Sequence, residues 1–289
     1  MSAAPEDRAD PPAEALRRWE ETAIEFARLA GAEIVASLGR TLSVRYKTGA
    51  GQGDELLFRD PVSEVDQRVE SLIRARLAEL HPDHGIIGEE MEDHPAAPDS
   101  PVWAIDPVDG TTNFVNGLPL FAASIGVLHR GRPVAGAVWC STSHALRSGV
   151  YHACGGGPLS FDGAAIEGGP NPAVRRRLSG EPRVDPGAVL PWETRKTGSA
   201  AIECAFVAAG LLEVARFERP NVWDVAGGLC LVAAAGGTAF VLCDQERGWE
   251  RFAGFGDDPR SWRGQLVIGP EEAAARRKDA LAAADGGRA

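Results

Sequence analysis

The chain has 289 residues, of which 44% are hydrophobic and 25% are charged, as in an ordinary globular protein. These values exclude a small protein stabilised by disulfides or metals, a collagen-like or coiled-coil protein and a fully disordered chain. They favour two domains or one large α/β unit. Acidic residues outnumber basic ones by 41 to 30, a formal net charge of −11. This balance disfavours nucleic acid as the main partner, because such binding needs a net positive field.

The cysteines and the N-terminus indicate a cytoplasmic protein. The five cysteines are scattered and form no Cys-x-x-Cys pair, which is typical of reduced thiols. Residues 1–13 lack the basic start and apolar stretch of a secretory signal, and we expect a disordered lead-in there. The uncharged run 225–243 is as long as a membrane span, but Gly236-Gly237 divides it. It therefore predicts a buried helix followed by a buried strand, and no membrane partner.

Two long helices are predicted in the first third of the chain. Apolar residues recur at intervals of three and four over 14–38, the pattern of an amphipathic helix that ends before Gly39. A second helix is predicted from Asp60-Pro61, an N-cap followed by a first-turn proline, to about residue 80. Between them we expect a mobile loop over 49–53 and a less certain segment over 55–59.

The remaining pattern is one of short strands and further helices. Strands over 85–88 and 102–106 each end in carboxylates, so both deliver acids to one sheet edge. A hairpin over 124–129 and 133–140 follows, with a third antiparallel strand over 145–154. The glycine-rich segment 155–158 divides an N-terminal α+β subdomain, 14–155, from a C-terminal α/β subdomain, 156–289. In the second subdomain we expect helices over 199–209, 224–235 and 271–284 and strands over 211–217, 238–243 and 265–268; region 161–193 indicates strands only weakly.

The segment 103–114, WAIDPVDGTTNF, carries the strongest chemical signal. Its strand is expected to end at Asp106, where Pro107 sets a turn that returns Asp109 three positions later. Two carboxylates would then face one point. The following Gly-Thr-Thr, 110–112, would begin a helix whose free N–H groups suit a phosphate.

Other carboxylates favour a metal site over a simple turn. Asp106 and Asp109 alone could merely cap a turn before a helix. Glu89 and Glu90 end the preceding strand, however, and Asp224 lies at a later helix start. Hard cations such as Mg²⁺ prefer oxygen ligands and keep several waters, so three or four carboxylates at one edge would suffice.

These segments resemble the inositol monophosphatase family. The matching motifs are GEE at 88–90, WAIDPVDGTTNF at 103–114, RKTGSAA at 195–201 and WDVAG at 223–227, in order over about residues 14–270. The resemblance implies an α/β fold with layered αβαβα architecture, as in the sugar phosphatases. It also implies a homodimer that hydrolyses a phosphate monoester with two or three Mg²⁺ ions per site and is inhibited by Li⁺.

The resemblance assigns metal ligands by position. They are Glu89, Asp106, the carbonyl of Val108, Asp109 and Asp224. Asp106 would bridge two cations, of which one lowers the pKa of an attacking water and the other stabilises the leaving alkoxide. Glu90 would support these ligands without binding metal itself.

The resemblance also implies three catalytic side chains, Glu89, Thr111 and Asp66. Thr111, paired with Glu89, would orient and deprotonate the water. Asp66 would orient metal-bound water, although Ser63-x-x-Asp66 also fits a helix capping box, and both interpretations stay open. The substrate contacts are assigned to Asp109, Gly110, Thr111, Gly198, Ser199, Ala200 and Asp224.

The natural substrate stays open. The family commonly places a glutamate seven positions before the Asp of its Trp-Asp motif to bind inositol hydroxyls, but Phe217 occupies that position here, with Glu218 beside it. The leading hypothesis is an Mg²⁺-dependent phosphatase for inositol 1-phosphate. Nucleotide 3′,5′-bisphosphates, fructose 1,6-bisphosphate and histidinol phosphate are alternatives. A regulatory protein that binds RNA or a protein partner is the alternative of another class, although the basic run 175–177 is more typical of a solvated loop.

Overall fold

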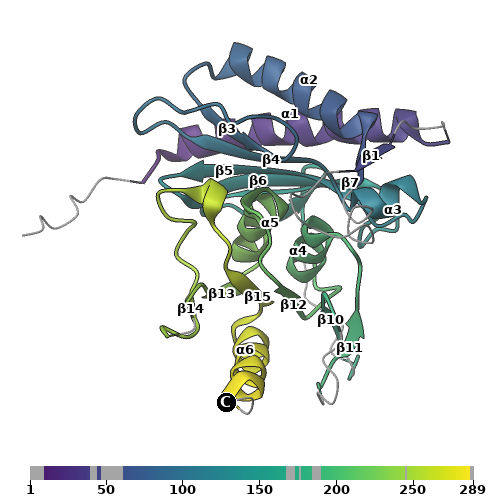
Figure 1. Ribbon diagram of the computed structural model, residues 1–289, viewed down its shortest axis with the longest axis vertical. Coiled ribbons are helices and arrows are strands. Elements are labelled where there is room, and N and C mark those ends of the chain that lie inside the picture. The colour runs from purple at the N-terminus through teal and green to yellow at the C-terminus, as the bar shows by residue number, and fades with distance from the viewer. Residues whose placement is uncertain are drawn as a thin grey trace, which may run out of the picture.

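The computed structural model describes residues 10–39, 44–46, 61–166, 173–175, 177–183, 190–244 and 246–286. Layers alternate in the order helix, sheet, helix, sheet, helix from the top to the bottom of Figure 1. This is the expected αβαβα architecture. The predicted loop 49–53, the segment 55–59, residues 1–9 of the lead-in and Arg176 of the basic run lie outside the described residues.

Helix α1 (Ala13–Ser37) covers the outer face of the first sheet. Its buried stripe includes Phe26, Ala30 and Ile34 and packs on strands β5 (Ala122–His129) and β6 (Arg132–Cys140). The helix ends at Ser37, as the predicted amphipathic pattern indicates. The spacing of the apolar residues was therefore sufficient to place this element.

Helix α2 (Glu64–Leu80) lies beside α1 and begins later than predicted. Residues Pro61–Ser63 form strand β2, which pairs antiparallel with β1 (Val44–Tyr46), so the predicted start at Asp60-Pro61 is wrong; Asp60 itself lies outside the described residues. Ser63 and Asp66 exchange hydrogen bonds in a capping box. These bonds satisfy the free amides of the first turn and fix the helix start after Ser63.

The first sheet has the strand order β3-β4-β5-β6-β7-β8-β9. Strand β3 (Gly85–Gly88) is parallel to β4 (Val102–Asp109), and the later pairs are antiparallel. The predicted hairpin of β5 and β6 and the third strand, β7 (Gly149–Cys154), are confirmed. Beyond segment 155–158 the sheet continues through β8 (Ser160–Phe161) and β9 (Ala164–Ala165). The division of the chain into subdomains stays a prediction.

The middle layer consists of α4 (Ala200–Ala208) and α5 (Val222–Ala234), which pack on each other. Helix α5 also lies against β5 and β6, where glycines allow backbone to approach backbone. A Cβ atom on Gly136 would lie only 2.4 Å from the carbonyl oxygen of Gly227. Close packing at this point brings the start of α5 towards the strand ends of the first sheet.

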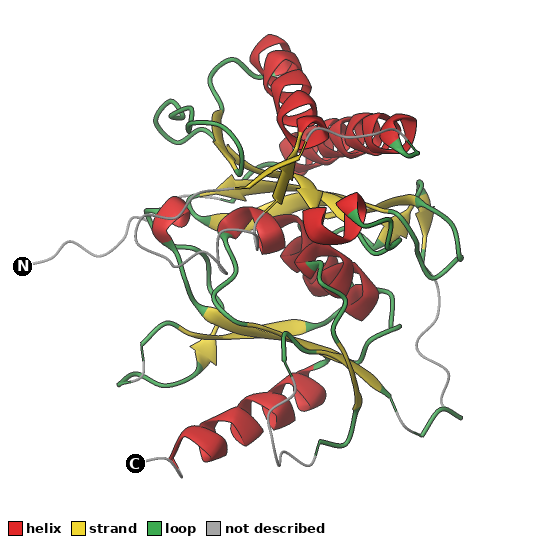
Figure 2. Ribbon diagram, turned by 45° about the vertical axis from the view of Figure 1, so that its right-hand side comes forward, coloured by secondary structure: helices red, strands yellow, loops and turns green. Residues whose placement is uncertain are grey.

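The second sheet has the order β11-β10-β12-β15-β13-β14. Its strands are β10 (Leu178–Gly180), β11 (Glu193–Arg195), β12 (Val214–Phe217), β13 (Thr238–Leu242), β14 (Glu250–Arg251) and β15 (Gln265–Gly269). Figure 2 shows α6 (Glu271–Gly286) on the face of this sheet that points away from the middle layer. Arg277 of α6 is buried and donates to both oxygens of Glu181, at 2.7 and 2.9 Å, which ties the helix to the sheet.

The uncharged run 225–243 folds as predicted, as a helix followed by a strand, because it is divided between α5 and β13. Among the described residues, none of the helices combines the length and the apolar character needed to cross a membrane.

Candidate active site

The carboxylates of Asp106 and Asp109 project from the end of β4. The register between β4 and β5 shifts between these residues, so the backbone remains a strand, with a β-bulge, as far as Asp109. The turn predicted at Pro107 is therefore wrong, because a bulge tolerates a proline that cannot donate to the ladder. Both carboxylates are buried, at 2% and 8% exposed. Burial, followed by the charges of Glu89 and Asp109, raises the pKa of Asp106.

Thr111 begins the short helix α3 (Thr111–Val115), as predicted. Gly110 caps this helix with φ +85°, a left-handed conformation that favours glycine. The Thr111 hydroxyl lies 2.8 Å from the carbonyl oxygen of Val108 and 3.1 Å from Oδ1 of Asp66. The pairing of Thr111 with Glu89, which the resemblance implies, stays a prediction. The structure shows Asp66 as a hydrogen-bond partner of Thr111.

Asp66 caps its own helix and also faces the site. Its Oδ2 accepts hydrogen bonds from the Ser63 amide, at 3.0 Å, and from the Ser63 hydroxyl, while Oδ1 accepts from Thr111. Burial raises the pKa of Asp66 to about 6, and the charge of Glu89 acts in the same direction. The capping interpretation is confirmed, and it leaves one carboxylate oxygen directed at Thr111.

Asp109 lies against the first turn of α4. It accepts hydrogen bonds from the Ser199 hydroxyl at 2.5 Å, the Ala200 amide at 3.3 Å and the Ala201 amide at 2.7 Å. Burial nevertheless raises the pKa of Asp109 to about 6, because these donors offset only part of its desolvation. Ser199 and Ala200, which the resemblance assigns to the substrate, therefore also hold Asp109 in place.

Asp224 lies in the first turn of α5, as predicted. The Asn221 amide donates to its Oδ2 at 2.7 Å. Burial, followed by the charges of Asp109 and Glu89, raises the pKa of Asp224 well above its usual range. Burial and the charges of Glu89, Asp109 and Asp224 do the same for Asp106. The structure thus gathers four acids from the ends of β3 and β4 and the start of α5.

These acids fit a divalent cation. Within the described ranges, no lysine or arginine pairs with Asp106, Asp109 or Asp224, and the groups that perturb their pKa values include no basic side chain. Buried like charges are unfavourable unless cations or protons neutralise them. Carboxylate and carbonyl oxygens are the donors that Mg²⁺ and similar ions prefer. Among the described residues, however, no group of three or more histidine, cysteine, aspartate or glutamate side chains is arranged so that it could hold a metal ion as it stands.

Two residues that the sequence did not single out hold the segment before α4. Oε1 of Glu203 accepts from the Thr197 hydroxyl at 2.8 Å, and burial raises the pKa of Glu203 to about 7. The Asn113 amide donates to the carbonyl oxygens of Thr197, at 2.7 Å, and of Leu120, at 2.6 Å. Asn113 lies within the motif 103–114, and Glu203 is the one acidic residue of the otherwise apolar helix α4. The sequence could therefore have marked both as candidate supporting residues.

The family's inositol-binding glutamate has no direct replacement here. Phe217, at that position, is buried in the apolar core between the second sheet and the middle helices. The neighbouring Glu218 pairs with Arg216 and, at 3.0 Å, with Arg183. The carboxylate beside Phe217 is thus engaged by arginines.

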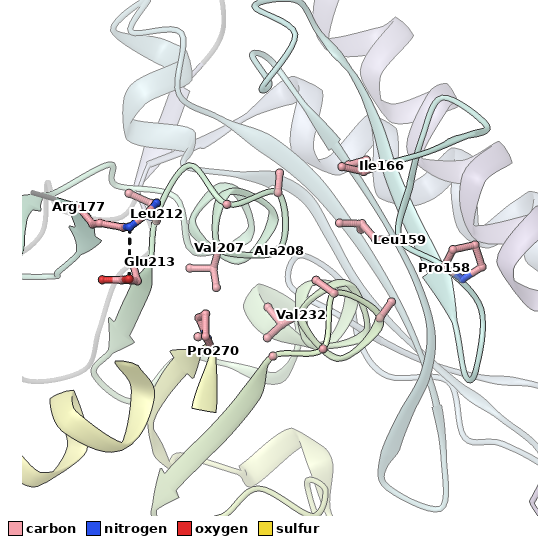
Figure 3. A pocket seen from close by; sticks show the side chains of 17 residues that line it. Pro158, Leu159, Ile166, Arg177, Val207, Ala208, Leu212, Glu213, Val232 and Pro270 are labelled. Carbon is pink, nitrogen blue, oxygen red and sulfur yellow. Dashed lines mark ion pairs between the residues drawn. The ribbon is translucent and has the colours of Figure 1, made fainter. Parts of the chain in front are cut away.

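A separate cavity lies at the opposite ends of α4 and α5 from the acidic cluster. Its volume is about 360 Å³, and its walls include Leu159, Val207, Leu212 and Val232, with the ion pair of Arg177 and Glu213 at one side (Figure 3). It contains none of the predicted metal or catalytic residues. The candidate chemistry therefore belongs to the acidic cluster.

The chain is similar to known proteins over most of its length. The model of the inositol monophosphatase family matches residues 15–275. The chain belongs to the inositol monophosphatase family. It is 36% identical to inositol-1-monophosphatase SuhB of Mycobacterium tuberculosis over 222 residues, or 68% of this chain and 76% of that protein. It is 32% identical to Nus factor SuhB of Xylella fastidiosa over 203 residues, or 64% of this chain and 69% of that protein.

The fold is also shared with solved members of the family. The extragenic suppressor protein SuhB of Bartonella henselae has a TM-score of 0.70 at 26% identity, covering 91% of this chain and 98% of that one. Family membership confirms the expected fold and the expected class of enzyme, a phosphoric monoester hydrolase. The family is generally metal-dependent and acts on small phosphorylated substrates.

Proposed function

We propose that the chain is an Mg²⁺-dependent phosphatase of a small phosphate monoester, with inositol 1-phosphate as the leading substrate. The observation that carries the proposal is that Asp106, Asp109 and Asp224 are buried together. The charge of Glu89 raises the pKa of all three, and no lysine or arginine among the described residues pairs with these three aspartates. Several relatives are named inositol-1-monophosphatases. Their names support the choice of substrate.

The metal ligands would be Glu89, Asp106, the Val108 carbonyl, Asp109 and Asp224, with two or three Mg²⁺ ions per site. Bound Mg²⁺ would supply a water of lowered pKa and positive charge near the leaving oxygen. The protein's part is to hold the ligands in position. Asn221 orients Asp224, and the amides at the start of α4 orient Asp109.

Proton transfer is assigned to Thr111, Asp66 and Glu89. The Thr111 hydroxyl donates to Asp66 at 3.1 Å, so it can accept a proton from the attacking water while it gives its own proton to that carboxylate. A pKa of about 6 suits Asp66 to accept a proton near neutral pH, because a general base works best when its pKa is close to the working pH. We assign Glu89 to the attacking water as well, which it would orient and deprotonate together with Thr111, as the resemblance implies.

The substrate would bind through its phosphate at the Gly110 and Thr111 amides and through its alcohol part at Gly198–Ala200. Asp109 and Asp224 would also face it. Because Phe217 replaces the family's inositol-binding glutamate, we keep nucleotide 3′,5′-bisphosphates, fructose 1,6-bisphosphate and histidinol phosphate as rival substrates. The enzyme is further proposed to be a cytoplasmic homodimer that Li⁺ inhibits.

The decisive test is phosphate release from inositol 1-phosphate and from the three rival substrates, each measured with Mg²⁺ and with EDTA. We expect Mg²⁺-dependent release, fastest from one compound and reduced by millimolar Li⁺. Light scattering after size exclusion would test the dimer. If no compound is hydrolysed by folded protein with Mg²⁺, the regulatory alternative becomes preferred, and binding of RNA and of protein partners should then be measured.

A further inference from the structure

Arg260 is held rigidly in the C-terminal half of the chain. It is the middle residue of the 3-10 helix η2 (Pro259–Ser261), whose first residue follows Asp258. The Asp258 carboxylate accepts hydrogen bonds from the Ser261 amide, at 3.4 Å, and from the Ser261 hydroxyl, at 2.6 Å. Aromatic packing supports the segment further, with ring centroids 5.0 to 6.0 Å apart among Phe252, Phe255 and Trp262.

The guanidinium of Arg260 joins two elements of different layers. Nη1 donates to the carbonyl oxygen of Gly88 at 2.6 Å and to Oδ1 of Asp93 at 3.2 Å. The same guanidinium lies 4.6 Å from the ring centroid of Trp223. Gly88 is the last residue of β3, and Trp223 lies in the first turn of α5. One side chain therefore links the edge of the first sheet to the start of the middle helix.

Two of these contacts, those with Gly88 and Trp223, lie next to acids of the cluster. Gly88 immediately precedes Glu89, and Trp223 immediately precedes Asp224. The charge of Glu89 raises the pKa of Asp224, so these two acids repel each other across the gap that Arg260 spans. A link between their neighbouring residues opposes their separation.

Trp223 depends on this contact more than most buried tryptophans. Its side chain is 5% exposed, and its indole nitrogen has no hydrogen-bond partner among the described residues. Buried tryptophan nitrogens usually find such a partner. Packing and the cation over its face must therefore orient the ring, and a cation–π contact with a partly desolvated arginine is a substantial interaction.

The other side of the Glu89 segment is held independently. Glu70 of α2 is fully buried, accepts from the Glu90 amide at 2.8 Å and pairs with Arg74 at 2.8 Å. This contact fixes the segment to α2 but does not reach α5. Arg260, by contrast, reaches from the Glu89 segment to the Asp224 segment through its contacts with Gly88 and Trp223.

We propose that Arg260 is a positioning residue that fixes the distance between Glu89 and Asp224 and thereby sets the affinity of the site for its divalent cation. Its guanidinium contacts a carbonyl, an indole and Asp93, so it constrains the acidic cluster without neutralising it. The inference rests on the proposed metal-dependent function. Residues that support metal ligands typically change metal affinity by about 10- to 100-fold when they are removed.

The test compares Arg260→Ala and Arg260→Lys with a matched control, Arg263→Ala. Arg263 belongs to the same segment, and its hydrogen bonds within the described residues go to the carbonyl oxygens of Arg260 and Trp262. Two quantities are measured for each protein: the Mg²⁺ concentration for half-maximal phosphatase activity, and the rise in melting temperature that Mg²⁺ causes without substrate. The second quantity does not depend on catalysis.

We expect Arg260→Ala to need about tenfold more Mg²⁺ in both measurements, Arg260→Lys to recover most of this loss, and Arg263→Ala to match wild type. Half-maximal concentrations within twofold of wild type for Arg260→Ala would overturn the inference. If Arg260→Ala does not fold, the inference is tested on Arg260→Lys. That variant is expected to bind Mg²⁺ nearly as well as wild type. If wild type itself shows no response to Mg²⁺ in either measurement, the proposed function fails instead.

Discussion

Replacing Asp109 with asparagine is expected to stabilise the metal-free protein at neutral pH. Burial raises the pKa of Asp109 from 3.8 to about 6, and each pKa unit corresponds to about 1.36 kcal/mol. Ionising this carboxyl in the folded protein therefore costs about 3 kcal/mol above pH 6. Because the folded pKa lies above the unfolded one, the cost is absent below pH 3.8 and grows as the pH rises between these values.

Asparagine removes the charge but keeps part of the hydrogen bonding. One amide oxygen replaces two carboxylate oxygens that accept from Ser199, Ala200 and Ala201, a loss of about 1 kcal/mol. The net gain of about 2 kcal/mol would raise the melting temperature by roughly 4 °C in a chain of this size. In Mg²⁺ the order should reverse, because the variant loses a ligand.

The assay is thermal unfolding in EDTA at pH 7.5 and pH 4.5, repeated with Mg²⁺ at pH 7.5. Asp162→Asn is the control, because burial opposes ionisation of Asp162 but hydrogen bonds from Val150 and Arg147 lower its pKa. That variant should be less stable than wild type at pH 7.5. The reasoning is refuted if Asp109→Asn is less stable than wild type in EDTA at pH 7.5, or if its advantage does not shrink at pH 4.5.

Three further predictions concern the site and the core. Asp106→Asn should keep the circular dichroism spectrum but lower Mg²⁺-dependent turnover by more than about 100-fold, the upper range for residues that only support ligands; wild-type turnover would contradict its bridging role. Gly136→Ala should lower the free energy of unfolding in urea by about 1–3 kcal/mol, since its Cβ would meet Gly227, whereas Gly155→Ala has contacts no closer than 3.5 Å and should have little effect. Burial lowers the pKa of His84 to about 4, so this side chain should destabilise the protein as the pH falls from about 6.5 to 4, opposite to the contribution of Asp109; the stability of His84→Asn relative to wild type should therefore rise over that range, and a difference that does not change with pH would contradict this origin.

The sequence could predict those features that depend on neighbouring residues. The apolar spacing over 14–38 specified α1, and the glycine pair after α5 separated that helix from β13. Most of the candidate acids could be named because they lie in a contiguous motif or at a helix start. Short strands such as β10 and β11, of three residues each, offer too few residues for an alternating pattern to be recognised.

Features that join distant segments could not be predicted in this way. The bulge before Asp109 depends on how β4 pairs with β5, and a turn was the simpler local explanation of the proline. Asp66 and Thr111 are 45 residues apart, and Arg260 and Gly88 are 172 residues apart. No local pattern reports such contacts, because they form only when the layers have been assembled.

The central place of α5 sets an order for biosynthesis. This helix, Val222–Ala234, covers the inner side of β4, β5 and β6, which were translated about a hundred residues earlier. During translation this face of the sheet stays exposed until α5 has left the ribosome. Chains released before Val222 would therefore present a bare apolar face to chaperones and to one another, and aggregation is the characteristic fate of such intermediates.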